Sequence, residues 1–203
     1  MKVITILDRL CSTNNYLIIY KNEAVLVDAS VCVEEVEKAL EGAKLKGILL
    51  THSHFDHIFK LDEIREKFDC SVYIHEKGYS SLFDADKNIS STITPFEVKN
   101  ASNIIKIKND EVLDFFTFPI KVIHTPGHSH CSVCYEIGDY LFTGDTLFSA
   151  CIGRNDFWHS NEEDQQKSLK KLLALSPKIK YFSGHGHSFD YNRLVKVINK
   201  YKK

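Results

Sequence analysis

Five apolar, strand-like segments of this 203-residue chain each end in a turn that carries a histidine or an aspartate. A small or turn-forming residue after a strand is common, so one such event would mean little. Five of them indicate strands that end along one edge of a layered sheet structure, where their polar side chains converge. The segments are residues 25–28, 47–57, 120–128, 140–146 and 179–187.

The densest of these turns directly follows the apolar run 47–50 and reads Thr51-His52-Ser53-His54-Phe55-Asp56-His57. In an extended loop, His52 and His54 would point the same way, while Asp56 and His57 would reach a neighbouring position. Imidazole nitrogen and carboxylate oxygen are favoured ligands of zinc and related divalent ions. The spacing therefore favours a pair of metal ions, against the simpler interpretation of a polar loop that is rich in histidine.

The other four segments supply possible partners for this cluster. Their polar residues are His128 after Thr125-Pro126-Gly127, Asp145 after Thr143-Gly144, His185 after Ser183-Gly184, and Asp28 after Val25-Leu26-Val27. Among the remaining histidines, His124 lies within a predicted strand and is expected to be structural. His187 would share a loop with His185 but is expected not to bind metal, and His75, His130 and His159 are expected to be structural or solvent-exposed.

Hydrophobic periodicity predicts a chain in which strands and helices alternate. Helices are expected at 33–42, 56–68, 161–175 and 189–201, with a capping box at Ser160–Glu163. Residues 86–103 are rich in Ser, Thr and Asn and predict an irregular surface loop that could lie beside the site. Strands are expected at 2–7, 16–20, 24–28, 47–51, 71–74, 104–107, 111–113, 119–124, 132–137, 140–143 and 179–182. One domain, 1–203, built from two sheets covered by helices would satisfy this pattern.

Composition limits the classes of partner. The formal net charge of −1 gives no electrostatic reason to expect nucleic acid or an anionic membrane as a partner. The chain has no apolar run of membrane-spanning length, and its N-terminus lacks a signal-peptide pattern. We therefore expect a cytoplasmic protein that acts on a small molecule, and the sequence leaves its oligomeric state open. The six cysteines include Cys131 and Cys134, whose spacing on a predicted strand favours structural thiols over a disulfide or a shared metal.

At this point the sequence resembles the metallo-β-lactamase superfamily, in particular the short glyoxalase II-like (hydroxyacylglutathione hydrolase-like) subgroup. The resemblance runs from Val25 to His185, and its core is the signature His52-x-His54-x-Asp56-His57, followed in order by His128, Asp145 and His185. Gly144-Asp145-Thr146-Leu147-Phe148 leading into Ile152-Gly153-Arg154 is similar to the short subgroup. The resemblance implies an α+β fold, a four-layer αββα sandwich, with two divalent metal ions.

The same resemblance implies a role for each residue. It assigns His52, His54 and His128 to a first metal, Asp56, His57 and His185 to a second, and Asp145 to a bridge between them. Asp28 would support the site rather than bind metal. Zinc is the favoured metal, and iron or manganese would suit the same ligands.

Two such ions can hold a hydroxide between them, which predicts a hydrolase whose nucleophile is a bridging hydroxide. Asp56 is in addition the expected catalytic residue, because its free oxygen could orient that nucleophile. A thioester is the expected substrate, since its thiolate leaves without a general acid. Arg154 could bind a substrate carboxylate or brace a loop, and Phe157 and Trp158 are expected in the core rather than in a pocket wall.

Several alternatives stay open. Full-length glyoxalase II enzymes have an additional C-terminal helical region that contacts glutathione, whereas this sequence ends 18 residues after His185, so another small acyl thioester is possible. The site would also suit a lactone or phosphodiester hydrolase, an iron-dependent oxygenase or redox protein, or a non-catalytic metal-binding module. The complete ligand set makes the last the least expected.

Overall fold

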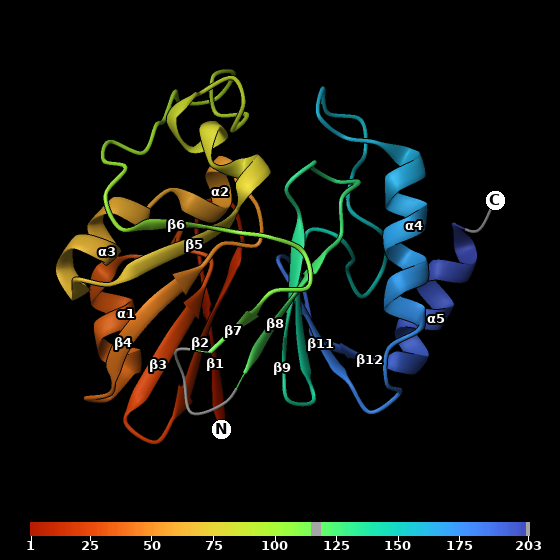
Figure 1. The fold of residues 1–203 in the computed structure, drawn as a ribbon, viewed down its shortest axis with the longest axis horizontal. Helices are drawn as coiled ribbons and strands as arrows, with labels where there is room; N and C mark the ends of the chain where they lie inside the picture. The colour runs from red at the N-terminus through yellow and green to blue at the C-terminus, as the bar shows by residue number, and fades with distance from the viewer. Residues whose placement is uncertain (115–118, 202–203) are drawn as a thin grey trace. The chain divides into compact units, whose positions relative to one another are not determined.

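The computed structural model describes residues 1–114 and 119–201, which form two compact units, Met1–Ile107 and Lys108–Lys203. In the described part of each unit, a six-stranded sheet is combined with helices that come from the same unit (Figure 1). Each unit contains both strands and helices, as expected for an α+β fold.

The sheet of the first unit has its strands in sequence order, from β1 to β6. The pairs β1–β2 and β2–β3 are antiparallel, and the three following pairs are parallel. Parallel β3 and β4 therefore end at the same edge of the sheet. The strands are β1 (Lys2–Leu7), β2 (Asn14–Tyr20), β3 (Glu23–Val27), β4 (Lys44–Leu49), β5 (Ser71–His75) and β6 (Ile104–Ile107).

The helices of the first unit are α1 (Val33–Leu40), α2 (Phe55–Ile58) and α3 (Leu61–Phe68), with 3₁₀ turns η1 (Glu76–Gly78) and η2 (Ser80–Phe83). Apolar side chains of α1 and α3, such as Val36 and Ile64, are fully buried in one core with residues of the sheet. The prediction of a single helix over 56–68 was wrong. The backbone N–H of Lys60 donates to Ala29 O at 2.8 Å, which diverts it from the helix and separates α2 from α3.

The second unit has the strand order β12-β11-β10-β9-β8-β7, in which only β10 and β11 pair in parallel among the described strands. Gly144 at the end of β10 is paired with Ser183 at the end of β11, so these two strands also end at one edge. The strands are β7 (Val112–Leu113), β8 (Ile120–His124), β9 (Val133–Ile137), β10 (Tyr140–Gly144), β11 (Lys180–Ser183) and β12 (Phe189–Asp190).

Two helices, α4 (Glu162–Leu173) and α5 (Tyr191–Lys200), bury Leu169 and Leu194 in the core of this unit. Two predictions were wrong in detail here. The residue that caps α4 is Asn161, whose side chain accepts from Asp164 N at 2.9 Å, because the Ser160 hydroxyl is bonded elsewhere. Residues 189–190 pair with β11 instead of starting the last helix. No helix in the described ranges is long and apolar enough to cross a membrane.

Candidate metal centre

The loop after β4 brings four predicted metal ligands together within the first unit. We call His52, His54, Asp56 and His57 the first donor group. The His52 ring centroid lies 4.5 Å from that of His54 and 4.2 Å from that of His57. Asp56 Oδ2 lies 3.7 Å from His57 Nε2. The three imidazoles are buried, whereas the Asp56 side chain keeps 16% of its surface exposed, so this carboxylate is accessible to a substrate.

Asp28 supports this group from the end of β3. Its Oδ2 lies 2.8 Å from His57 Nδ1, and its Oδ1 accepts from the backbone N–H of Thr51 at 2.8 Å. An ionised carboxylate can only accept hydrogen bonds, so the ring proton of His57 is on Nδ1 and Nε2 retains its lone pair. A carboxylate that holds the far nitrogen of a histidine in this way is a common second layer around a metal ligand. The sequence analysis placed Asp28 in this supporting role.

The Thr51 hydroxyl links Asp28 to a second histidine, His52, through hydrogen bonds. Its hydroxyl lies 2.9 Å from Asp28 Oδ2 and 3.0 Å from His52 Nδ1. Because the hydroxyl donates its single proton to the carboxylate, it accepts from His52 Nδ1–H and leaves the Nε2 lone pair of His52 available. The sequence analysis missed Thr51. The sequence signal that could have identified it is the position of this hydroxyl residue directly before His52, the first histidine of the cluster.

The second unit carries the remaining predicted ligands, His128, Asp145 and His185, which we call the second donor group. They follow strands β8, β10 and β11. Asp145 Oδ2 lies 3.8 Å from His128 Nε2 and 3.5 Å from His185 Nε2. These separations are long for a hydrogen bond. They are close to the spacing of about 3.4 Å between two ligand atoms held by one tetrahedral zinc ion.

A backbone carbonyl orients His128. Its Nδ1 donates to Arg154 O at 2.8 Å, and since a carbonyl only accepts, Nε2 of His128 keeps its lone pair. Between Asp145 and Arg154 the chain makes a tight turn, which is closed by a hydrogen bond from Phe148 N to Cys151 O at 2.8 Å. The guanidinium of Arg154 is exposed and makes a bidentate contact with Asp156 at 2.9 and 3.0 Å. The structure thus gives Arg154 a bracing role through its backbone.

Gly153 lies against the backbone of Asp145. A Cβ atom at position 153 would lie 1.7 Å from Asp145 O and 3.3 Å from the Cβ atom of His128. No side chain fits there, because the nearest atom is backbone and cannot move independently. The sequence analysis quoted Gly153 only as part of a family pattern, so its steric role was missed.

The start of α4 fixes the loops that hold the second donor group. Ser160 Oγ donates to His128 O at 2.6 Å, which explains why Ser160 does not cap α4. Asn161 N donates to Gly127 O at 2.9 Å, and the Gln165 side chain donates to Thr146 O at 2.9 Å. One helix terminus therefore contacts both the His128 loop and the Asp145 loop.

The other histidines have different surroundings. His124 Nε2 donates to His130 O at 3.0 Å, the contact of a structural residue, and His187 is exposed. Burial, followed by the nearby His130 and His128, lowers the pKa of His159 to about 4, so this ring is neutral near pH 7.

The expectation of a core position for Trp158 was wrong, since 64% of its surface is exposed, although its ring contacts His159 at 4.6 Å. The described thiols form no disulfide. Cys131 lies beside Ser129 Oγ, at 3.3 Å, whereas Cys134 lies beside Thr125 Oγ1, at 3.4 Å. The two thiols therefore have different neighbours, but Cys131 lies before β9, which begins at Val133, so the strand spacing assumed in the prediction does not apply to it.

The donors present fit divalent metal ions. Each unit offers imidazole nitrogens and carboxylate oxygens, which are ligands of zinc, iron and manganese. Contacts at Nδ1 leave Nε2 as the coordinating atom in His52, His57 and His128. The fit therefore rests on proton positions that the surrounding residues impose, as well as on residue type.

Comparisons with known proteins agree with this chemistry. A family model described as the metallo-beta-lactamase superfamily matches residues 8–185. The protein named probable metallo-hydrolase YqgX of Bacillus subtilis (strain 168) is 37% identical over 185 residues, covering 87% of this chain and 86% of its own length.

Two crystal structures are similar over nearly the whole chain. BLEG-1 B3 metallo-beta-lactamase has 33% identity and a TM-score of 0.89, with 96% of this chain and 97% of that chain covered. TTHA1623 in a di-iron-bound form has 27% identity and a TM-score of 0.85, with 96% and 98% covered. The predicted superfamily, its fold and its use of divalent metal ions are confirmed. The chain belongs to the metallo-beta-lactamase superfamily and is a metal-dependent hydrolase of that family.

Proposed function

We propose that the two donor groups together form one dinuclear metal centre. In this proposal His52, His54 and His128 hold one ion, Asp56, His57 and His185 hold the other, and Asp145 bridges them. The observation that carries it is the position of Asp145 Oδ2, within 3.8 Å of two imidazole Nε2 atoms of its own unit. Two bound divalent ions would lower the pKa of a water molecule and polarise the scissile carbonyl.

The first donor group would supply more than ligands. Asp56 is the catalytic residue of the proposal, because one carboxylate oxygen can bind metal while the other accepts a proton from the attacking water. The hydroxyl of Thr13 lies 3.5 Å from Asp56 Oδ2, a weak contact with this carboxylate. The partial exposure of Asp56 allows a substrate to approach it.

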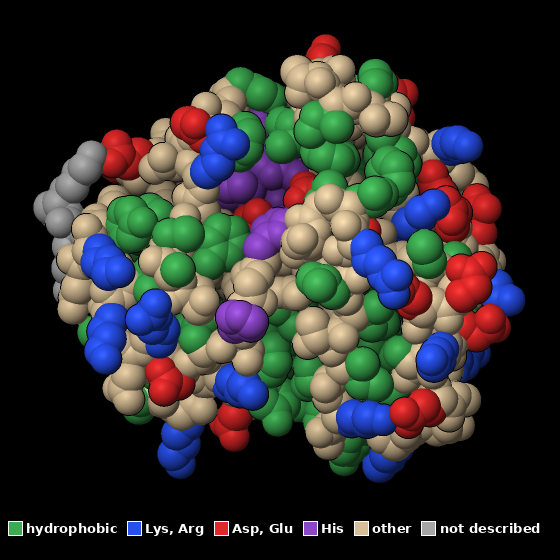
Figure 2. All heavy atoms as spheres, turned by 180° about the vertical axis from the view of Figure 1, so that it is seen from behind, with side chains coloured by type: hydrophobic (Ala, Val, Ile, Leu, Met, Phe, Trp, Pro, Cys, Tyr) green, Lys and Arg blue, Asp and Glu red, His purple; other side chains and the backbone are tan. Residues whose placement is uncertain are grey.

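We infer that the substrate is a small acyl thioester of the hydroxyacylglutathione type. A thiolate leaves readily, because the pKa of its conjugate acid is about 8.5, so no dedicated general acid is needed. A phosphodiester polyanion would favour a basic surface. Figure 2 shows lysine and arginine side chains interspersed with acidic ones over one face, in agreement with the net charge of −1.

The experiment compares substrate classes on one preparation. Zinc-loaded protein is assayed with S-lactoylglutathione, an acetyl thioester of a small thiol, a homoserine lactone, a phosphodiester and a penicillin. The penicillin is included because one similar structure is that of a metallo-beta-lactamase. We expect kcat/KM on a thioester to exceed that on each other class by at least about a hundredfold, near 3 kcal/mol. A preference for the lactone, phosphodiester or penicillin would overturn the assignment.

A further inference from the structure

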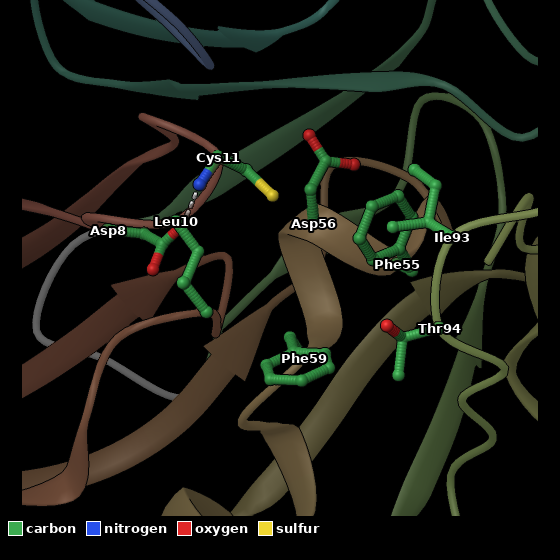
Figure 3. Close-up of a pocket in the computed structure, with 8 residues that line it drawn as sticks. All are labelled: Asp8, Leu10, Cys11, Phe55, Asp56, Phe59, Ile93 and Thr94. Atoms are coloured by element: carbon green, nitrogen blue, oxygen red, sulfur yellow. Dashed lines mark hydrogen bonds between the residues drawn. The ribbon is translucent and has the colours of Figure 1, made fainter.

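A cavity within the first unit lies directly beside Asp56. It has a volume of about 290 Å³, near the lower end of the range of about 300–1,000 Å³ found for small-molecule sites. Its walls come from three segments: the loop after β1, the helix α2, and the 86–103 loop (Figure 3). The lining residues are Asp8, Leu10, Cys11, Phe55, Asp56, Phe59, Ile93 and Thr94.

The side chains in the cavity wall are mainly apolar. Figure 3 shows Phe55 and Ile93 on one side of Asp56 and Cys11 on the other. Leu10 and Ile93, which line the cavity, are 78% and 68% exposed. Apolar surface left open to water next to a reactive group is suited to an apolar portion of a ligand.

The charges in the wall define which portion of a substrate fits. The ionisable carboxyl groups among the lining residues are Asp8 and Asp56, and the described residues that line the cavity include no lysine or arginine. Asp8 accepts from the backbone N–H of Cys11 at 2.7 Å and is 8% exposed, so it stabilises the loop from inside. In the proposed centre Asp56 binds a cation, so Asp8 is the wall carboxylate that would repel a negatively charged group. The cavity is therefore suited to an uncharged group.

The walls are held in place by hydrogen bonds and ring contacts. Phe55 N donates to the backbone oxygen of Asn88 at 3.0 Å, and the buried Asn88 side chain donates to Phe96 O at 2.7 Å. The rings of Phe59 and Phe96 lie 5.3 Å apart. These contacts attach the 86–103 loop to α2, so the cavity is formed before a ligand binds.

We propose that this cavity binds the acyl chain of the substrate and selects uncharged aliphatic chains. The proposal rests on the thioesterase function and adds the acyl specificity of that site. The reacting carbonyl would lie at Asp56, the chain would extend between Leu10 and Ile93, and the thiol portion would lie outside. At about 30 Å³ for each water-sized group, a cavity of about 290 Å³ has room for an acyl chain of roughly six to eight carbons.

The kinetic test uses a series of thioesters of N-acetylcysteamine with acetyl, butyryl, hexanoyl, octanoyl and dodecanoyl groups. We expect kcat/KM to rise about two- to fourfold per methylene up to hexanoyl or octanoyl and then to stop rising. In the double variant Leu10→Ser/Ile93→Ser, the ratio of hexanoyl to acetyl kcat/KM should fall at least about fivefold. Both side chains are exposed, so folding should tolerate their replacement.

Ile105→Ser is the matched control. Ile105 is 41% exposed on β6 and does not line the cavity, so this variant should keep the hexanoyl-to-acetyl ratio of the unmodified protein. A ratio that is flat along the series in the unmodified protein would overturn the proposal. An unchanged ratio in Leu10→Ser/Ile93→Ser, or an equal fall in Ile105→Ser, would overturn it as well.

A second measurement separates the cavity from the proposed reaction. The amide analogue of the hexanoyl thioester is added, and alkylation of individual cysteines is followed by peptide mass spectrometry. Occupation of the cavity should slow alkylation of Cys11 at least about fivefold, while the exposed Cys32, outside the cavity, should react at its original rate. If no thioester is hydrolysed, the proposed function fails, and selective protection of Cys11 still supports the cavity. Absence of that protection at millimolar analogue overturns the acyl site.

Discussion

Both donor groups include residues that follow parallel strands, but they are held in different ways. The first group follows β4, which pairs in parallel with β3, and Asp145 and His185 of the second group follow the parallel strands β10 and β11, whereas His128 follows the antiparallel β8. In the first unit, one buried carboxylate, Asp28, is bonded to His57 and to Thr51. In the second unit, a backbone carbonyl orients His128 and a glycine leaves space for the Asp145 backbone. The first arrangement depends on charge, and the second depends on backbone position.

This difference changes which substitutions each group tolerates. A carboxylate can be replaced by an amide of the same shape, so the first group can lose its charge without losing its packing. The second group has no equivalent change, because its supporting atoms belong to the main chain. We therefore expect electrostatic variants to act mainly in the first unit and steric variants mainly in the second.

The largest effect is expected from the ligand that the proposal shares between both ions. Asp145→Asn keeps the shape of the side chain but removes its negative charge. Removing one partner of a buried charge pair costs about 3–5 kcal/mol, so zinc affinity should fall at both sites by about a thousandfold. His185→Ala should empty one site only. Chelator competition and metal content per chain measure both effects, and equal losses in the two variants would show that Asp145 serves a single ion.

The next largest effect tests the steric half of the comparison. Gly153→Ala places a methyl group in the space of Asp145 O and should reduce the free energy of unfolding by about 3 kcal/mol. Gly42→Ala is the control, because a Cβ there meets no atom within 4 Å and only the positive φ of 89° is unfavourable. That control should cost about 1–2 kcal/mol. Urea unfolding of metal-free protein measures both free energies of unfolding. An equal decrease in the two variants would contradict the steric role of Gly153.

Sequence reasoning selected the candidate donors because each lies in a turn that follows an apolar run. His52, Asp145 and His185 follow strands whose ends could be recognised from composition alone. The order of the ligands along the chain then matched a family signature. Local patterns of this kind are preserved in the structure because strand and turn formation depend mainly on neighbouring residues.

The supporting contacts could not be predicted in the same way, because they join residues that are far apart in sequence. The break between α2 and α3 requires Ala29 O next to Lys60 N. The shifted cap of α4 requires the carbonyl of His128 next to the Ser160 hydroxyl. In the sequence Gly153 is one loop glycine among several, and only the structure shows that it lies against the backbone of Asp145. Tertiary contacts determine each of these details, and a single sequence does not contain them explicitly.

A third variant tests the electrostatic half of the comparison. Asp28→Asn leaves a side chain of the same size beside His57 but replaces a charged acceptor with a neutral amide. Loss of a group that orients a metal ligand costs about 10–100-fold in metal affinity, and we expect that range here. Zinc competition titration measures it, with circular dichroism as the control for folding. Affinity within twofold of the unmodified protein would show that shape alone positions His57.

The smallest effect is expected from the relay between Asp28 and His52. Thr51→Val keeps the β-branched shape but removes the hydroxyl that lies 3.0 Å from His52 Nδ1. Asp28 retains its contacts with Thr51 N and His57, so one hydrogen bond is lost, worth about 0.5–1.5 kcal/mol. Zinc affinity should therefore fall about three- to tenfold, less than in Asp28→Asn, while Thr51→Ser, which keeps a hydroxyl, should stay close to the unmodified protein. A loss in Thr51→Val as large as in Asp28→Asn would make the hydroxyl, rather than the carboxylate, the main support of the first donor group. No loss at all would mean that His52 is held by its packing against His54 and His57.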